Sequence, residues 1–237
     1  MPYMPFYYYY DPYYLVLVLP ALIIAMIAQF KVQSTFKKYA QQMSLRGRTA
    51  AQITREILDN NGLFSVKVEQ VRGNLTDHYD PKANVIRLSD SVHDSTSVAS
   101  IGVAAHEAGH AVQHATGYTP IRLRNAVLPV ANIGSHFAVP VIFLGLLFSF
   151  EPLVIAGIVL FSALVLFQVI TLPVEFNASR RALVTLESSC MLDDTELRGA
   201  KKVLSAAAMT YVAATLVSAM QLLRLVLLSR GRNRRRD

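Results

Sequence analysis

The sequence is poor in cysteine and, at its start, in basic residues. Cys190 is the single cysteine among 237 residues, which excludes an internal disulfide framework and any metal site built from thiolates. A bound metal ion would therefore need histidine and carboxylate ligands. Residues 1–12 contain no lysine or arginine, so we expect no cleavable signal peptide there, because such peptides begin with basic residues.

Long apolar runs dominate the composition. Hydrophobic residues make up 53% of the chain and the mean hydropathy is +0.35, which is typical of membrane proteins. Residues 1–12 form a tyrosine-rich leader that is either an aromatic belt at the membrane interface or a disordered tail. The apolar segments predicted to form membrane helices are residues 13–30, 126–150, 152–173 and 203–229, the last either spanning or membrane-associated.

The net charge of +7 and the pI of about 9.6 come from basic residues that flank these apolar runs. The positive-inside rule explains such a distribution, and we therefore expect no nucleic-acid partner. Lys31, Lys37 and Lys38 follow the first span and predict that the chain enters the cytoplasm there. A crossing at 203–229 would put the basic tail, residues 230–237, outside. We therefore expect that segment not to span, and the tail to lie on anionic lipid.

Residues 31–125 are the most polar part of the chain and predict a small soluble domain. Residues 48–60 have the pattern of an amphipathic helix, and residues 64–71 alternate apolar and polar side chains as a strand does. Residues 75–79 and 84–88 predict a hairpin closed by an Asp-Pro-Lys-Ala turn. This hairpin is either purely structural or offers an open edge that pairs with an extended peptide.

The motif with the clearest chemistry is His106-Glu107-Ala108-Gly109-His110, inside a segment with a helical pattern. Residues four apart lie on one face of a helix, so both imidazoles can bind one metal ion. Glu107 would reach a water molecule on that ion and act as a base in peptide hydrolysis. The small Ala-Gly pair lets another element approach closely. The alternative is a core helix with hydrogen-bonded histidines, which is costly without a metal.

A zinc site with two histidines needs a third protein ligand and keeps a position open for water. Glu175 is the best candidate, in a helix predicted over 174–202 with Pro173 at its first turn. The topology returns this segment to the side of the membrane that carries the histidines. Glu187 and Glu196 are alternatives. Glu175 could also be only a favourable negative charge at a helix start.

Several other side chains are candidates for supporting roles. His114 lies about 12 Å along the helix axis from His106, too far to share one ion, so we place it at the surface or near the ligands. Ser179 is a candidate for contacting a ligand or the substrate. His78 and Tyr118 are candidates for stabilising the oxyanion that forms during hydrolysis.

Two stretches resemble known families. The histidine motif with downstream Glu175-Phe-Asn-Ala-Ser179 is similar to membrane gluzincins of the HtpX and CAAX-prenyl-protease type, whose third ligand is a Glu followed four residues later by Asp. Ser179 stands at the Asp position here. Residues 77–81 and 106–118 are motifs that resemble those of the YugP-type neutral zinc metallopeptidases of bacteria. The resemblance to this family covers nearly the whole chain. The resemblance implies a membrane-bound zinc peptidase that hydrolyses a peptide or membrane-protein substrate.

The sequence therefore predicts a mainly α integral membrane protein with a small α+β, zincin-like catalytic domain, in which the hairpin precedes the His-Glu-x-x-His helix. We expect His106, His110 and Glu175 to bind Zn²⁺ and Glu107 to act as general base. A metal-binding membrane transporter or sensor is the main alternative, although the spans carry few ionisable residues. A catalytically silent scaffold that retains the motif is the other.

Overall fold

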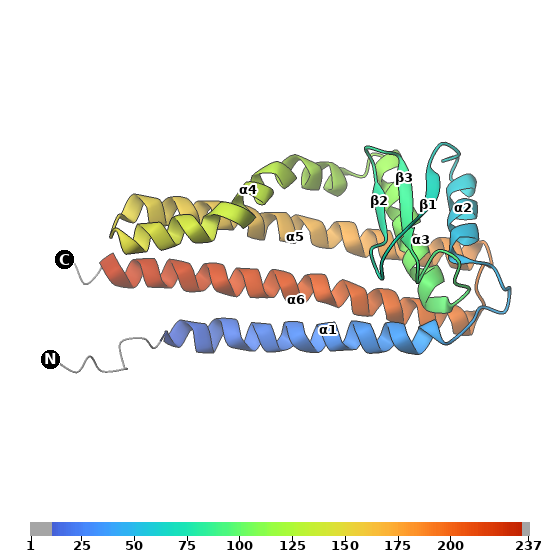
Figure 1. The fold of residues 1–237 in the computed structure, drawn as a ribbon, viewed down its shortest axis with the longest axis horizontal. Helices are drawn as coiled ribbons and strands as arrows, with labels where there is room; N and C mark the ends of the chain where they lie inside the picture. Colours follow the sequence, from blue (N-terminus) through green and yellow to red (C-terminus); the bar gives the residue numbers. More distant parts are fainter. Residues whose placement is uncertain (1–10, 234–237) are drawn as a thin grey trace. The chain divides into compact units, whose positions relative to one another are not determined.

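The computed structural model describes residues 11–233, with side chains up to residue 229. The predicted tyrosine-rich leader therefore lies outside the described residues except for its last two, as do the side chains of the predicted basic tail. The helices, after a π-helical turn at Tyr14–Val18, are α1 Leu19–Ala40, α2 Ala50–Asn60, α3 Val98–Ala115, α4 Thr119–Leu147, α5 Glu151–Ser188 and α6 Asp194–Asn233 (Figure 1). The strands are β1 Lys67–Val71, β2 His78–Asp80 and β3 Val85–Ser89.

The chain divides into two units by its internal contacts. We call the first the helical unit, which consists of Met1–Ile27, Val127–Val169 and Val212–Asp237. The second, the mixed unit, consists of Ala28–Ala126 and Ile170–Tyr211 and contains the whole sheet. Helices α1, α4, α5 and α6 each contribute residues to both units.

The sheet of the mixed unit has the strand order β1-β3-β2. Strands β2 and β3 pair antiparallel, with Tyr79 opposite Ile86, which confirms the predicted hairpin. The turn between them is closed by the Asp80 carboxylate, which accepts hydrogen bonds from the backbone N–H groups of Lys82 and Ala83. Strand β1 lies on the other side of β3 and runs parallel to it. As a result, β2 is an edge strand.

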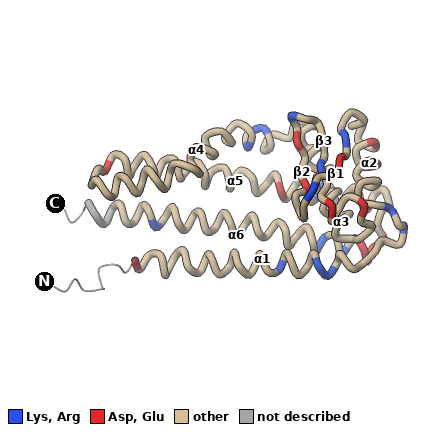
Figure 2. The backbone as a smooth tube through the Cα atoms, viewed as in Figure 1, with Lys and Arg blue, Asp and Glu red and all other residues tan. Residues whose placement is uncertain are grey.

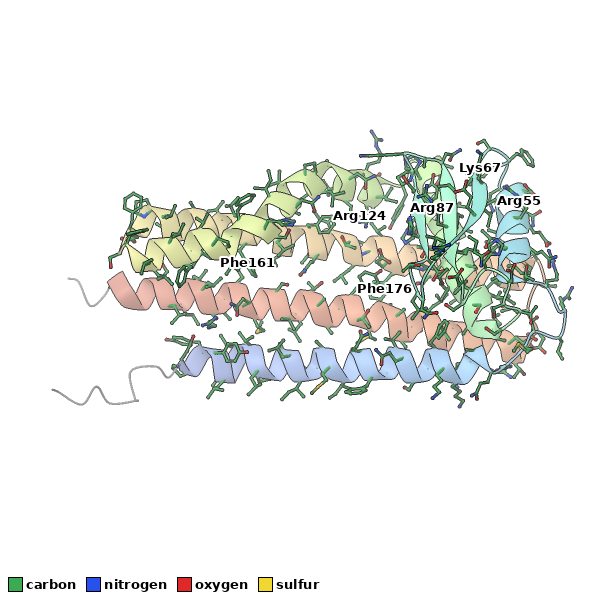
Figure 3. The ribbon with its side chains drawn as sticks, viewed as in Figure 1. Arg55, Lys67, Arg87, Arg124, Phe161 and Phe176 are labelled. Carbon is green, nitrogen blue, oxygen red and sulfur yellow. The ribbon has the colours of Figure 1, made fainter. Side chains whose placement is uncertain are left out.

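Helices α2 and α3 cover this sheet and form the core of the mixed unit with it. The predicted amphipathic helix is present as α2, and a capping box between Thr49 and Gln52 fixes its start. Its apolar side packs into a core whose largest members are fully buried. These include Ile53, Ile57 and Leu58 of α2, Ile86 and Leu88 of β3, Ile101 of α3, Leu186 of α5, and Met191. The arginine labelled on β3 in Figure 3, Arg87, forms an ion pair with Asp80 of β2.

Four helical segments are long and apolar enough to cross a membrane. They are Tyr14–Ala40, Thr119–Leu147, Glu151–Ser188 and Asp194–Ser229. In the helical unit, α4 and α5 form a tight hairpin because glycines bring their backbones together. A Cβ built on Gly134 would clash with the carbonyl oxygen of Leu160, and one on Gly145 would lie 2.7 Å from the backbone nitrogen of Val154. Small residues at helix contacts are typical of membrane proteins.

The structure corrects one helix prediction. Pro173 lies inside α5 and does not start a separate helix, because α5 continues to Ser188 and the next helix begins at Asp194. A proline removes one backbone hydrogen bond, a loss that membrane helices tolerate when neighbouring groups accommodate it. Glu175 is therefore carried on the same uninterrupted helix as the predicted second arm of the membrane hairpin.

An ion pair joins the start of the first helix to the end of the last within the helical unit. The guanidinium of Arg224 on α6 lies 2.6 Å from the carboxylate of Asp11, and it also stacks 5.3 Å above the ring of Tyr14. In the mixed unit, a Cβ on Gly199 of α6 would lie 2.8 Å from the ring of Tyr39 on α1. Within each unit, α1 and α6 run in opposite directions (Figure 1).

Candidate metal centre

Helix α3 positions the histidines and Glu107. Ser97 caps its start by accepting a hydrogen bond from the backbone N–H of Ser100, and the helix continues to Ala115. Its alanines are almost completely buried against the rest of the mixed unit, at Ala104, Ala105, Ala108 and Ala111. His106 and His110 project from one face, with ring centroids 4.6 Å apart and ring planes nearly perpendicular. Both side chains are only 13–14% exposed.

Close packing of α5 on α3 brings Glu175 to these histidines. A Cβ built on Gly109 would lie 2.6 Å from the carbonyl oxygen of Ala178, so only glycine permits this approach. Glu175 is 4% exposed, and its Oε2 lies 3.3 Å from Nε2 of His106 and 3.6 Å from Nε2 of His110. The three ligand atoms lie within 4.8 Å of one another, which makes this trio a group able to hold a metal ion.

Hydrogen bonds around His110 indicate that its Nε2 is the atom available to a cation. The Gln113 amide NH₂ donates to the carbonyl of Val174 and to Oδ1 of Asn177, so its oxygen is the atom that faces His110 Nδ1 at 3.0 Å. Nδ1 must therefore carry the proton of the neutral ring, and Nε2 presents a lone pair. Asn177 is held in turn by Arg181, whose Nε donates to the same Oδ1.

In this arrangement two hydrogen-bond acceptors, Nε2 of His110 and Oε2 of Glu175, face each other. They repel unless a positive charge lies between them. The buried Oε2 of Glu175 has no hydrogen-bond partner of good geometry, and it faces the lone pair of His110 Nε2. Leaving a buried carboxylate oxygen without a donor or cation is costly. One metal ion between the two imidazole nitrogens and this oxygen removes the conflict, so the residues present fit a His-His-Glu zinc site.

The electrostatics around His110 agree with this fit. Burial lowers the pKa of His110, but the close contact with the Glu175 carboxylate and the negative charges of Glu107 and Glu175 outweigh burial and raise that pKa above its ordinary value. The protein thus attracts positive charge to the space between His110 and Glu175. A proton or a metal ion can supply it, and the two compete for the same nitrogen.

His106 is oriented by Ser179. Ser179 lies one turn after Glu175 on α5, and its Oγ is 3.1 Å from Nδ1 of His106. A hydroxyl can accept a hydrogen bond from that nitrogen, which again leaves Nε2 directed at Glu175. Both ligand histidine candidates are thus held through Nδ1 by a neutral partner.

Glu107 lies beside this trio and contacts the edge of the sheet. It is 9% exposed, and its Oε2 accepts a hydrogen bond of 3.0 Å from the backbone N–H of Tyr79 on β2. A pocket of about 340 Å³ opens next to it and is lined by His106, Glu107 and Glu175 together with Asp77, Ser179 and Tyr211. Tyr211 comes from α6, and its hydroxyl forms a hydrogen bond with the Glu175 carboxylate.

The other side chains singled out in the sequence lie elsewhere. His78 is exposed and contacts the carbonyl of Thr76 through Nδ1, whereas Tyr118 stacks with the guanidinium of Arg181. Neither lines the pocket of Glu107, so the structure does not support them as oxyanion-stabilising groups. His114 packs edge-on against Tyr79. Glu196 caps the start of α6 by accepting from the backbone of Asp193 and also accepts from Leu45.

Sequence reasoning missed four groups that shape this site: Gln113, Asn177, the backbone N–H of Tyr79, and Tyr211. Gln113 carried a weak signal, because it follows His110 by three residues and so lies on the same helix face. Asn177 follows Glu175 by two residues and becomes relevant only through the packing of α5 on α3. Tyr211 had no local signal.

The buried His-His-Glu trio, the adjacent Glu107 and the four apolar helices together define a candidate metal-dependent hydrolase of the membrane. The chain belongs to the family described as "Putative neutral zinc metallopeptidase", whose profile matches residues 14–230. It is 50% identical over 216 residues to the "Putative membrane protease YugP" of Bacillus subtilis (strain 168), covering 91% of this chain and 96% of that protein. No solved structure matches the chain.

Proposed function

We propose that this protein is a membrane-bound zinc-dependent endopeptidase, in which His106, His110 and Glu175 hold Zn²⁺ and Glu107 is the general base. The observation that carries the proposal is that two imidazole nitrogens and a carboxylate oxygen that receives no hydrogen bond converge on one point. Glu107 lines the adjoining pocket. Zinc in such a site lowers the pKa of a water molecule towards about 7 and polarises the carbonyl that is attacked.

Glu107 is well placed to move the proton of that water. The Tyr79 N–H holds Oε2, which fixes the carboxylate while its other oxygen remains free to accept a proton. During attack, Glu107 takes a proton from the water and then delivers it to the nitrogen of the leaving amine. Proton transfer by a positioned carboxylate contributes about 10²–10⁴-fold to a rate.

Strand β2 is proposed to bind the substrate in an extended conformation. It is one of the two edge strands of the sheet, and the Tyr79 N–H faces Glu107 and not β3. Within a strand, the N–H and C=O of one residue point to the same side, so the Tyr79 carbonyl lies on this open edge as well. A peptide added alongside β2 would donate to the Tyr79 carbonyl, while the Tyr79 N–H stays bonded to Glu107, and its scissile bond would lie next to that carboxylate.

The mixed unit is proposed to face the cytoplasm, with α6 crossing the membrane beside α1. The contacts of α6 with α1, including the Arg224–Asp11 ion pair, and its length and hydropathy favour spanning over lying on the surface, in place of the expectation from sequence that residues 203–229 do not span. A spanning α6 would put the basic tail, residues 230–237, outside. The basic residues at the mixed-unit ends of the apolar runs keep that side inside by the positive-inside rule. Reaction of a cysteine placed at Lys82 with a membrane-impermeant thiol reagent on intact cells would contradict this orientation.

The Glu107→Gln substitution tests the function. It keeps the shape of the side chain and removes the base, so we expect zinc content to remain and casein or membrane-protein degradation to fall by about 10²–10⁴-fold. Glu69→Gln, on the exposed strand β1, is the matched control and should keep full activity. Undiminished proteolysis by the Glu107→Gln protein would favour the scaffold or the transporter, for which the site holds metal without hydrolysing peptides.

A further inference from the structure

A second groove lies between α1 and α6, on faces of these helices that differ from those lining the metal-centre pocket. It has a volume of about 580 Å³ and is entirely within the mixed unit. Helix α1 contributes Lys31 and Lys38 to this groove, whereas Val32 and Phe36 of the same helix line the pocket of Glu107. The two hollows therefore share their helices but not their lining.

The lining of this groove is strongly cationic. Its basic residues are Lys31, Lys38, Arg198, Lys201 and Lys202. Among the residues that the structure describes, no carboxylate forms an ion pair with any of these five, and Arg198 donates only to the hydroxyl of Thr195. Five positive charges around one groove repel one another and create a field that attracts an anion.

The groove lies where the apolar parts of both helices end. The apolar run of α1 ends at Phe30, directly before Lys31, and the apolar stretch of α6 begins at Val203, directly after Lys202. Because the helices are antiparallel, these two ends meet, and Figure 2 shows their blue segments close together. Met209, which is 47% exposed, extends the groove along the apolar side of α6. The groove thus combines a cationic part, formed by the lysines and Arg198, with an apolar wall that includes Ala206 and Met209.

We propose that this groove binds the headgroup of an anionic phospholipid from the surrounding bilayer. The phosphate contacts the lysines, and an acyl chain follows the apolar wall beyond Ala206 and Met209. Such a lipid neutralises the repulsion and holds α1 against α6 near the Tyr39–Gly199 contact. The opposite faces of these helices wall the metal-centre pocket, so the lipid also supports that wall. The proposal does not depend on peptidase activity.

The test measures phospholipid binding to the purified full-length chain. Native mass spectrometry in detergent compares phosphatidylglycerol with phosphatidylcholine, for the wild type and for Lys38→Gln/Lys201→Gln/Lys202→Gln. We expect the wild type to prefer phosphatidylglycerol and the triple variant to bind it at least about tenfold more weakly, since each surface cation contributes about one kcal/mol to such binding. The control is Lys67→Gln/Arg72→Gln/Lys82→Gln, which removes the same charge from β1 and the loops around the hairpin and should bind as the wild type does.

Three results would overturn the proposal. They are equal binding of both lipids by the wild type, unchanged phosphatidylglycerol binding by the groove variant, and an equal loss in the control, which would indicate nonspecific attraction. Displacement of the lipid by an equimolar amount of inorganic phosphate would indicate a site for a free anion and would also overturn it. If the triple variant fails to fold, Lys38→Gln and Lys201→Gln measured separately should each weaken binding several-fold.

Discussion

Different interactions stabilise the interior of each of the two units of this protein. In the mixed unit, buried polar side chains such as Gln113 and Ser100 are hydrogen-bonded to defined partners, and the apolar core is sealed from solvent. In the helical unit, large apolar side chains such as Phe143 and Phe148 are more than 60% exposed, and the helices contact one another through glycines. The mixed unit can thus fix atoms with side-chain hydrogen bonds, whereas the helical unit requires lipid to cover its surface.

The largest effect is expected from Glu175→Ala, which removes the proposed metal ligand that α5 contributes within the mixed unit. A zinc site with two protein ligands is weak, so we expect purified protein to lose essentially all bound zinc and all proteolysis. Metal analysis of the purified variant measures the first and casein degradation the second. Glu187→Ala, at an exposed position on the same helix, should retain both. Full zinc content in the Glu175→Ala protein would rule Glu175 out as a ligand.

Replacing one large apolar side chain in each unit by alanine compares how much packing stabilises the two units. Ile53 is fully buried in the mixed unit, so Ile53→Ala should destabilise it by about 2–5 kcal/mol through lost packing and a cavity. Phe143 is 63% exposed in the helical unit, so Phe143→Ala should change stability by no more than about 0.5 kcal/mol. Thermal unfolding in detergent, followed by circular dichroism, measures both. Equal destabilisation would mean that Phe143 packs against protein in the assembled state.

A smaller effect is expected from Gln113→Leu, which keeps the volume of the side chain but removes the acceptor for His110 Nδ1. Loss of such an orienting hydrogen bond typically weakens metal binding about 10–100-fold. Competition with a zinc chelator measures the affinity. Gln70→Leu, on the exposed strand β1, is the control. An unchanged affinity would show that His110 does not depend on Gln113 for its tautomer.

The smallest effect is expected from Tyr211→Phe, because the other contacts to Glu175 remain. The hydroxyl of Tyr211 binds the Glu175 carboxylate from α6, so its removal should weaken zinc binding by about a few-fold, as loss of one hydrogen bond does. The same chelator competition applies, with Tyr14→Phe as the control far along the chain. Loss of activity without loss of zinc would instead assign Tyr211 a direct part in the reaction.

The parts of the fold that sequence predicted are those with strong local signals. Helix α2 and the β2–β3 hairpin followed from periodicity and turn residues, and the structure confirms them. Periodicity cannot identify the strand with which another strand pairs. β1 pairs in parallel with β3, although β2 lies between them in the sequence. Pro173 was misread because a proline at a helix start and one inside a membrane helix look alike in sequence.

The proposed ligands were more predictable than the groups that orient them. His106 and His110 lie within one motif, and Glu175 was selected because the topology returns it to their side. The orienting residue Asn177 and the contacting residue Tyr211 act through packing between helices that are far apart in the chain. No local pattern encodes such contacts. The place of Glu175 beside the histidines also depends on Gly109, whose missing side chain lets α5 approach.

The unbroken course of α5 through the metal centre places a strict condition on the spacing of its residues. Glu175 meets His106 and His110, and Ser179, one turn later, meets Nδ1 of His106. A single residue inserted between Glu175 and Ser179 would turn one relative to the other by about 100°. Only one of the two could then face His106. The number of residues in that turn is therefore constrained more tightly than the identity of Phe176, whose side chain is 46% exposed.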